Sequence, residues 1–297
     1  MSGAPAGSSG QPRPARRRHG LAALALLPFW LVVLFFLIAP TLSIVWGSFH
    51  HPNGDFTLAN YGFLNGEDKS LQPFVNSIVL SGATMVVGSI LGLLVAQAIL
   101  SARVRALEQL TITFSSVAAN FAGVPLAFAF IATLGVEGLV THWLKDAGIN
   151  IYSAGFTLYS IVGLAVVYSY FQIPLMVLLI LPALQAMKRE WREASDNLGA
   201  GGVTYLRRVA IPVLMPSVIA SALLLFANAF GAYATAYALT TGFVSLVPIA
   251  ISNVIAGDVT FDPGQGDALA VGLAAIMAVC VVGQALLQRR AGRFLRS

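Results

Sequence analysis

Six uncharged apolar segments, each long enough to cross a lipid bilayer, dominate the chain. A helix needs about 20 mostly apolar residues to cross a hydrocarbon core about 30 Å thick. Because lipid offers the backbone no hydrogen-bond partners, such segments span as helices. The sequence therefore predicts an all-α membrane protein with six transmembrane helices. They lie near 21–46, 74–100, 109–135, 157–182, 211–238 and 268–287, and none contains Asp, Glu, Lys, Arg or His.

The remaining composition narrows the class of protein. Only 10% of the residues are charged, where a soluble domain has about 25%. The net charge of +5 comes from short basic clusters that alternate with apolar segments, so it does not indicate a nucleic-acid partner. The single cysteine, Cys280, excludes an intramolecular disulfide and a cysteine-based metal site. We therefore expect no metal centre.

The distribution of Lys and Arg predicts the orientation in the membrane, since loops rich in these residues stay cytoplasmic. Fifteen of the 17 fall in the tails and loops of one side if the N-terminus is inside. The outer loops carry mainly acidic residues, among them Asp258, Asp262 and Asp267. We therefore predict a multi-pass protein with both termini in the cytoplasm. An odd number of spans would break this alternation.

These boundaries imply one membrane domain with two tails. Residues 1–20 are predicted to form a disordered basic cytoplasmic tail, because they are rich in Gly, Ser, Pro and Arg. Residues 21–288 form the six-span domain, with a cytoplasmic loop at 183–210, and residues 289–297 form a second basic tail. The uncharged stretch after the fifth span is too long for one helix, so we predict that 243–257 is a short interfacial or re-entrant segment.

The long cytoplasmic loop between the fourth and fifth spans has the pattern of two short helices. Apolar or small residues at i, i+3, i+4 and i+7 give the first helix one face among charged neighbours. Gly199 is placed to end this helix, and Thr204 can cap a second one over Tyr205–Ala210. Pro212 suits a helix's first turn. The residues of the face are Trp191, Ala194, Ser195 and Leu198.

This loop resembles the EAA signature of the inner-membrane subunits of binding-protein-dependent ABC importers. Ser195 replaces the second alanine of that pattern, and Gly202 stands where the family often has proline. The whole chain is similar to the one-domain, six-span permeases of the type I fold. The matching positions are Glu193, Ala194, Ser195, Leu198, Gly199, Ala200, Ile211 and Pro212, with Pro216 at a further site.

The resemblance implies a transport subunit of a bacterial plasma (inner) membrane, without catalytic residues or cofactors of its own. Its partners would be a dimer of ATP-binding subunits that holds ATP and Mg, a second permease subunit in a heterodimer, an extracytoplasmic solute-binding protein and membrane lipid. The chain has no G-x-x-x-x-G-K-[ST] motif to bind ATP itself. The alternative is a solvated loop whose arginines only set topology. The implied ATPase-coupling residues are Trp191, Glu193, Ala194, Ser195, Leu198, Gly199 and Ala200.

Polar side chains inside the apolar segments are candidates for a solute pathway, because amides and phenols in hydrocarbon need partners or water. A hydrogen bond between helices is the alternative for each. The candidates are Asn120, Tyr168, Tyr170, Gln172, Asn228, Tyr233 and Tyr237. Gly88 and Gly92, in contrast, have the GxxxG spacing of a close helix contact.

The solute remains open at the level of sequence. Segments on both sides of the loop resemble permeases for polyamines, aminoethylphosphonate and ferric iron, so a polyamine or another small charged solute is expected. Tyr168, Tyr170 and Tyr233 could offer ring faces to a cation. A sugar-type ABC permease is the alternative. An ion-coupled secondary transporter is a weaker one, because such proteins generally use ionisable groups within their spans.

Overall fold

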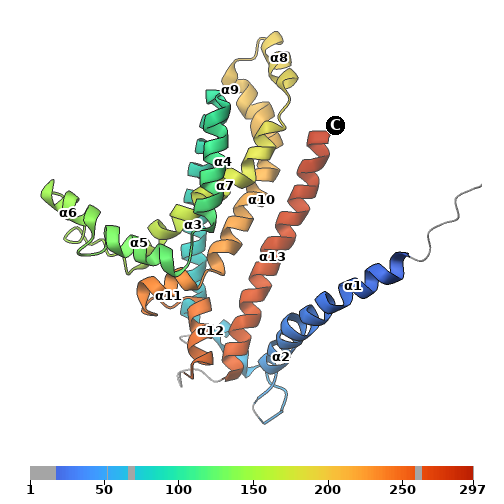
Figure 1. Cartoon of the computed structure of the whole chain (residues 1–297), viewed down its shortest axis with the longest axis vertical. Helices are drawn as coiled ribbons and strands as arrows, with labels where there is room; N and C mark the ends of the chain where they lie inside the picture. The colour runs from blue at the N-terminus through green and yellow to red at the C-terminus, as the bar shows by residue number, and fades with distance from the viewer. Residues whose placement is uncertain (1–17, 52, 66–70, 258–262, 297) are drawn as a thin grey trace, which may run out of the picture.

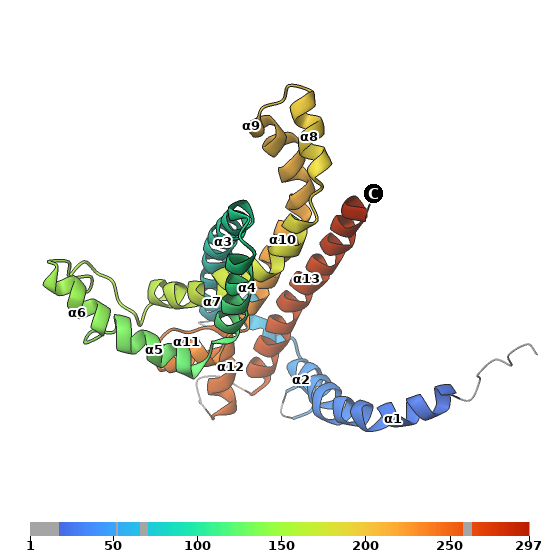
Figure 2. The same cartoon turned by 45° about the horizontal axis from the view of Figure 1, so that its top comes forward.

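The computed structural model describes residues 18–51, 53–65, 71–257 and 263–296. Its regular structure is helical, apart from an isolated β-bridge between His50 and Phe56. Within the described residues, six helices are long and apolar enough to cross a membrane. The predicted all-α membrane fold is confirmed, and Figures 1 and 2 show its arrangement.

Five helices form the central bundle. Helix α3 packs against α7 and α10, and α13 packs along α10. The core between them consists of fully buried aliphatic and aromatic side chains, such as Leu80, Leu164, Val167, Ile180 and Leu225. The five helices are α3 (Leu71–Ala102), α4 (Arg105–Asn120), α7 (Ile161–Gln185), α10 (Ile211–Phe230) and α13 (Pro263–Arg296).

Two glycines bring α3 and α7 into close contact, as the GxxxG spacing predicts. Both Gly88 and Gly92 are buried. A methyl group at Gly92 would lie 2.5 Å from Met176 Cβ and 2.8 Å from the carbonyl oxygen of Ile173. Only glycine therefore fits at this crossing.

The first span leaves the bundle and touches it only at one end. It consists of α1 (Arg18–Val33), a π turn η1 (Leu34–Ile38) and α2 (Ala39–Ser48). None of the side chains in its most apolar stretch is buried, and the span contacts the bundle through α2, which packs against α13. The helix begins inside the predicted 1–20 tail, whose first 17 residues lie outside the described part of the chain.

The joint between α2 and α13 is polar. Asn60, at the start of the 3-10 helix η2 (Ala59–Asn65), donates to the carbonyl oxygens of Ser48 and His50, 3.0 and 3.2 Å away. Gly47 lies against the Asp267 carboxylate of α13, and a Cβ atom at Gly47 would displace that side chain. Figures 1 and 2 show α1 pointing away from the bundle beyond this joint.

The predicted third span, 109–135, is wrong as a single helix. Helix α4 ends at Asn120, and the chain turns at Gly123, whose φ is +80°. Helix α5 (Val124–Leu134) then leaves the bundle and is followed by α6 (Leu139–Asp146). The left-handed glycine and the missing N–H of Pro125, in the first turn of α5, interrupt the helical hydrogen bonds. The apolar stretch long enough to span is displaced to Val124–Asp146.

The predicted fifth span, 211–238, also ends early. Helix α10 stops at Phe230, and a separate short helix, α11 (Ala234–Thr240), follows. Helix α12 (Val247–Ile255), inside the predicted segment 243–257, has only nine residues and is therefore about 14 Å long, too short to span. It packs against α13 and α3, and the N–H of Val247 donates to Ser77 Oγ at 3.0 Å.

The other predicted spans each correspond to one helix, with ends that differ from the predicted limits. Helix α3 covers 74–100, α7 begins four residues after 157 and continues past 182, and α13 covers 268–287. Helix α13 continues through most of the predicted 289–297 tail to Arg296. Its C-terminal end lies at the same end of the bundle as the loop between α7 and α10 (Figure 1).

Candidate functional site: the α7–α10 loop and the polar residues of the bundle

The loop between α7 and α10 forms the extreme end of the bundle (Figures 1 and 2). It contains α8 (Arg189–Asn197), α9 (Gly202–Tyr205) and a second π turn, η3 (Leu206–Ala210). Helix α8 contacts α9, and the two form a helical hairpin. Arg192 lies over the Tyr205 ring with its guanidinium carbon 5.6 Å from the ring centroid, so a cation–π contact joins them.

Helix α8 ends as predicted at Gly199. This residue has a left-handed backbone, with φ of +74°. Its N–H donates to the Asp196 carbonyl, and the Ala200 N–H donates to the Ser195 carbonyl, each at 3.0 Å. This pair of bonds is the Schellman motif, which requires a residue that tolerates positive φ. No neighbouring atom lies within 4 Å of a Cβ placed at Gly199.

The predicted small-residue face of α8 is only half covered by the chain itself. Ser195 is buried and Trp191 is half-buried, whereas Ala194 and Glu193 are exposed. Leu198 is 86% exposed. An exposed leucine beside a small residue at the end of the molecule leaves an apolar surface without a partner within the described residues.

The predicted start of the second loop helix is wrong. Helix α9 begins at Gly202, with Gly201 as its N-cap residue, so Thr204 lies inside the helix and forms no side-chain cap. The backbone then passes through the π turn directly into α10. Pro212 lies in the first turn of α10, as predicted, directly after this wider turn. Proline cannot donate to a carbonyl four residues back and its ring crowds that carbonyl, so a π turn just before it avoids both problems.

Two of the seven pathway candidates are core residues. Tyr168 and Gln172 of α7 are completely buried. The Tyr168 hydroxyl donates to the Ala232 carbonyl, and Gln172 Nε2 donates to the Leu225 carbonyl, each at 2.9 Å. These bonds connect α7 to the end of α10, so the alternative of an interhelical hydrogen bond describes both residues.

The other five candidates are accessible to different degrees. Asn120 and Asn228 are exposed, and Tyr237 is 44% exposed. Tyr233 stacks on Tyr237 with ring centroids 5.3 Å apart, and its hydroxyl lies 2.9 Å from Ser252 Oγ. The half-buried Tyr170 ring contacts Phe121 and Phe130 edge-on. Aromatic side chains thus gather near the α4–α5 break and at the α10–α11 turn.

The contact that holds the α4–α5 break was not predicted. Thr235 of α11 accepts a hydrogen bond from the Gly123 N–H at 2.7 Å, and its hydroxyl lies 3.3 Å from the Gly123 carbonyl oxygen. One side chain therefore satisfies both polar groups of the left-handed residue. The sequence signal for the break is the Gly123–Val124–Pro125 run, because glycine followed closely by proline interrupts a helix.

Comparison with known proteins identifies the family. A family model described as the binding-protein-dependent transport system inner membrane component matches residues 88–296, which is most of the chain. The chain belongs to this family. The match begins in the middle of α3 and includes the loop between α7 and α10. The family resemblance inferred from that loop is confirmed.

Permeases of several ABC transporters are similar in sequence. A probable ABC transporter permease of Sinorhizobium fredii, y4fN, is 31% identical over 265 residues, covering 87% of this chain and 42% of that protein. The spermidine/putrescine permease PotB of Haemophilus influenzae is 31% identical over 153 residues, covering 50% of this chain and 51% of its own. The chain therefore spans about half or less of these relatives.

A solved structure shares the fold. A chain of a bacterial ABC transporter involved in the import of the acidic polysaccharide alginate superposes with a TM-score of 0.66. The two chains are 17% identical, and the match covers 92% of this chain and 96% of the other. The type I importer transmembrane fold is thereby confirmed.

Proposed function

We propose that the chain is the permease subunit of an ABC importer, forms half of a translocation pathway and transmits the work of a separate ATPase to it. The observation that carries this function is the α8–α9 hairpin. It stands at the extreme end of the bundle, ends in a left-handed glycine and leaves Ala194 and Leu198 uncovered. A short helix with small residues on its open face permits close approach of a partner surface.

The open face suits a groove on an ATP-binding subunit. Glu193 and Ala194 are exposed, and no other part of the described chain lies within 4 Å of a Cβ placed at Gly199 or Gly201. Exposed charges beside an apolar contact can set the register of docking. We propose that a dimer of ATPase subunits docks here and binds the ATP and Mg, while this chain supplies no catalytic group. The orientation that follows is the predicted one, with both termini in the cytoplasm of a bacterium.

The remaining partners follow from the same assembly. A second permease subunit, in a heterodimer, would complete the pathway, and an extracytoplasmic binding protein would deliver the solute. The proposed pathway residues are the exposed Asn120, Asn228 and Tyr237 and the half-buried Tyr170 and Tyr233. Tyr168 and Gln172 are not included, because both are buried in the bundle core.

For the solute we propose a polyamine or another small charged compound. The similarity to the spermidine/putrescine permease supports this class. Other similar permeases are named for the transport of sulfate, thiamine and molybdenum, which are also small solutes. The stacked Tyr233 and Tyr237 rings offer a face to a cation. The fold shared with an alginate transporter supports the carbohydrate alternative.

Substitution of Gly199 tests the coupling role. Because φ at this position is positive, a β-branched residue strains the cap by about 1–2 kcal/mol, whereas asparagine tolerates this conformation. In proteoliposomes that contain the permease, ATPase and binding protein, we expect Gly199→Val to reduce solute-stimulated ATP hydrolysis and uptake severalfold. Gly199→Asn should retain most of both activities.

Two outcomes would contradict the proposed function. Equal uptake by the valine and asparagine variants would exclude a role for the α8 cap in coupling. Uptake by this chain alone, driven by an ion gradient, would favour the secondary transporter. Intact membrane insertion of both variants, checked by size-exclusion chromatography in detergent, serves as the control for folding.

A further inference from the structure

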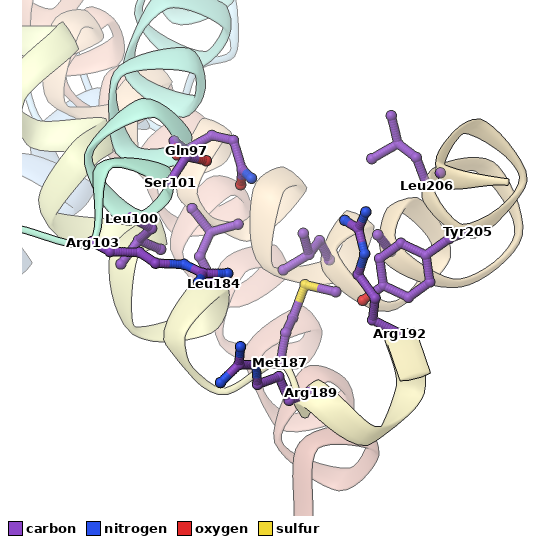
Figure 3. A pocket seen from close by; sticks show the side chains of 13 residues that line it. Gln97, Leu100, Ser101, Arg103, Leu184, Met187, Arg189, Arg192, Tyr205 and Leu206 are labelled. Atoms are coloured by element: carbon purple, nitrogen blue, oxygen red, sulfur yellow. The ribbon is translucent and has the colours of Figure 1, made fainter. Parts of the chain in front are cut away.

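A basic cavity lies beneath the α8–α9 hairpin, where the ends of α3, α7 and α10 meet. Its volume is about 680 Å³. Three arginines contribute to its wall: Arg103 after α3, and Arg189 and Arg192 on α8. Figure 3 shows Arg103 on the left, Arg189 next to Met187 in the lower centre, and Arg192 beside Tyr205 on the right.

The arginines retain unneutralised charge. Arg192 forms one long ion pair with Asp196, at 4.0 Å, and neither Arg103 nor Arg189 pairs with a carboxylate of the described residues. The backbone of Arg103 is left-handed, with φ of +55°, which is unusual for a residue other than glycine. A turn of this kind redirects the chain at the end of α3 and places the Arg103 side chain at the cavity.

An apolar cavity of about 550 Å³ continues from the basic one along the membrane-spanning helices. The two share Gln97, Leu184, Leu206 and Leu214 in their walls. The other residues of the apolar cavity come from α3 and the start of α10, and they are Leu93, Leu94, Ile211, Met215 and Val218. A positively charged cavity thus shares part of its wall with a largely apolar one, in which Gln97 is the polar side chain.

We propose that the joined cavities bind one anionic phospholipid of the cytoplasmic leaflet. Its phosphate would lie among the three arginines, whose guanidinium groups bind phosphate with paired N–H donors. An acyl chain would follow the aliphatic cavity between α3 and α10. Basic pockets between spans on the cytoplasmic side are suited to anionic headgroups. A soluble anion would satisfy the arginines but would leave the aliphatic walls uncovered, which is why the lipid is the better occupant.

The site differs from the proposed ATPase surface and is independent of it. Ser195 is buried on the inner face of α8, and Arg192 lines the cavity although 60% of its side chain is exposed. Glu193 and Ala194 are exposed and do not line it. A bound lipid would connect the root of the hairpin to the end of α3. The proposal requires only that this end of the bundle faces the cytoplasm.

Native mass spectrometry of the full-length chain, released from detergent, tests the proposal. The probes are phosphatidylglycerol, phosphatidylcholine with the same acyl chains, and inorganic phosphate. We expect one phosphatidylglycerol to be retained in preference to phosphatidylcholine. Combined Arg103→Gln and Arg192→Gln substitutions should weaken this binding about tenfold or more. Arg207→Gln is the matched control, since Arg207 is an exposed cytoplasmic arginine that does not line the cavity.

Each other outcome overturns the proposal. Equal retention of both lipids would show that the cavity does not select for the net negative charge of the lipid headgroup. Loss of phosphatidylglycerol in the presence of millimolar inorganic phosphate would show a soluble-anion site. An equal loss in Arg207→Gln would show diffuse attraction to the basic surface. If the double variant does not fold, the single variant Arg189→Gln and the charge-retaining variant Arg103→Lys provide the comparison, with weakened and preserved binding expected respectively.

Discussion

Thr235 shows how one side chain stabilises an irregular backbone within the bundle. Its hydroxyl serves both the N–H and the carbonyl of Gly123, where α4 gives way to α5. A buried or lipid-facing backbone group without a partner is costly, so this contact determines whether the break is stable.

We predict that Thr235→Val lowers the free energy of unfolding by about 1–3 kcal/mol, because a methyl group replaces the hydroxyl and leaves the Gly123 N–H without its partner. The Gly123 carbonyl would still accept from the Ala127 N–H, 3.2 Å away. Chemical denaturation in detergent micelles measures the change. Thr235→Ser retains the hydroxyl and should lose much less. Equal destabilisation by serine and valine would show that packing, and not the hydrogen bond, holds the break.

Individual residues were predictable from sequence where local geometry alone decides their role. Gly199 ends α8 because of its own conformational freedom, and Gly92 is buried because of its spacing from Gly88. Tyr168 and Gln172 were not assignable, because the same polar group can line a pathway or join two helices. A pathway role and a helix-joining role are distinguished only by the positions of the Ala232 and Leu225 carbonyls. These positions depend on how distant segments of the chain fold.

At the scale of elements, α3 and α7 approach each other closely at Gly92. This contact depends on small residues because apolar side chains gain nothing by leaving lipid for one another, so close van der Waals packing must hold the helices together. A side chain at Gly92 would meet the backbone carbonyl of Ile173, which cannot move aside as a flexible side chain could.

We predict that Gly92→Ala destabilises the bundle by about 1–3 kcal/mol through this overpacking. Gly82→Ala, on the same helix, should change stability by less than about 0.5 kcal/mol, since nothing lies within 4 Å of a Cβ at that position. The midpoint of thermal unfolding in detergent compares the two. A Gly92→Ala protein as stable as the parent would contradict the tight crossing.

The sequence predicted where helices occur better than it predicted where they are interrupted. Hydropathy located α3 and α7 within a few residues, because each is an uninterrupted apolar run, but α13 continues beyond its apolar part from 287 to Arg296. It could not locate the ends of α4 and α10, since the residues after Asn120 and Phe230 remain apolar although the helix stops. The capping role predicted for Thr204 failed for a related reason, because the chain from Gly202 continues into α10 through a π turn.

At the scale of the whole molecule, charge asymmetry defines two sides. The predicted cytoplasmic side carries 15 of the 17 basic residues, including those on α8 and at the end of α13. Both of these elements lie at the same end of the bundle, as the predicted topology requires (Figure 1).

Cysteine labelling tests the orientation directly, since Cys280 is the only native thiol. On a Cys280→Ala background, we expect Gly201→Cys to react with a membrane-impermeant maleimide only from the cytoplasmic side. Ser153→Cys, in the loop after α6, should react only from the outside, and both positions are exposed. Labelling of the two positions from the same side would refute the six-span topology.

The first span touches the bundle only at its far end, through Ser48, Gly47 and the side chains that meet them. A helix held in this way can be inserted by the translocation machinery, and can tilt, before the remaining helices have found one another. We therefore expect its insertion and the folding of the bundle to be separable events during biosynthesis. A temperature or lipid thickness that tilts the first helix should leave the other five in register, because the polar joint acts as a pivot.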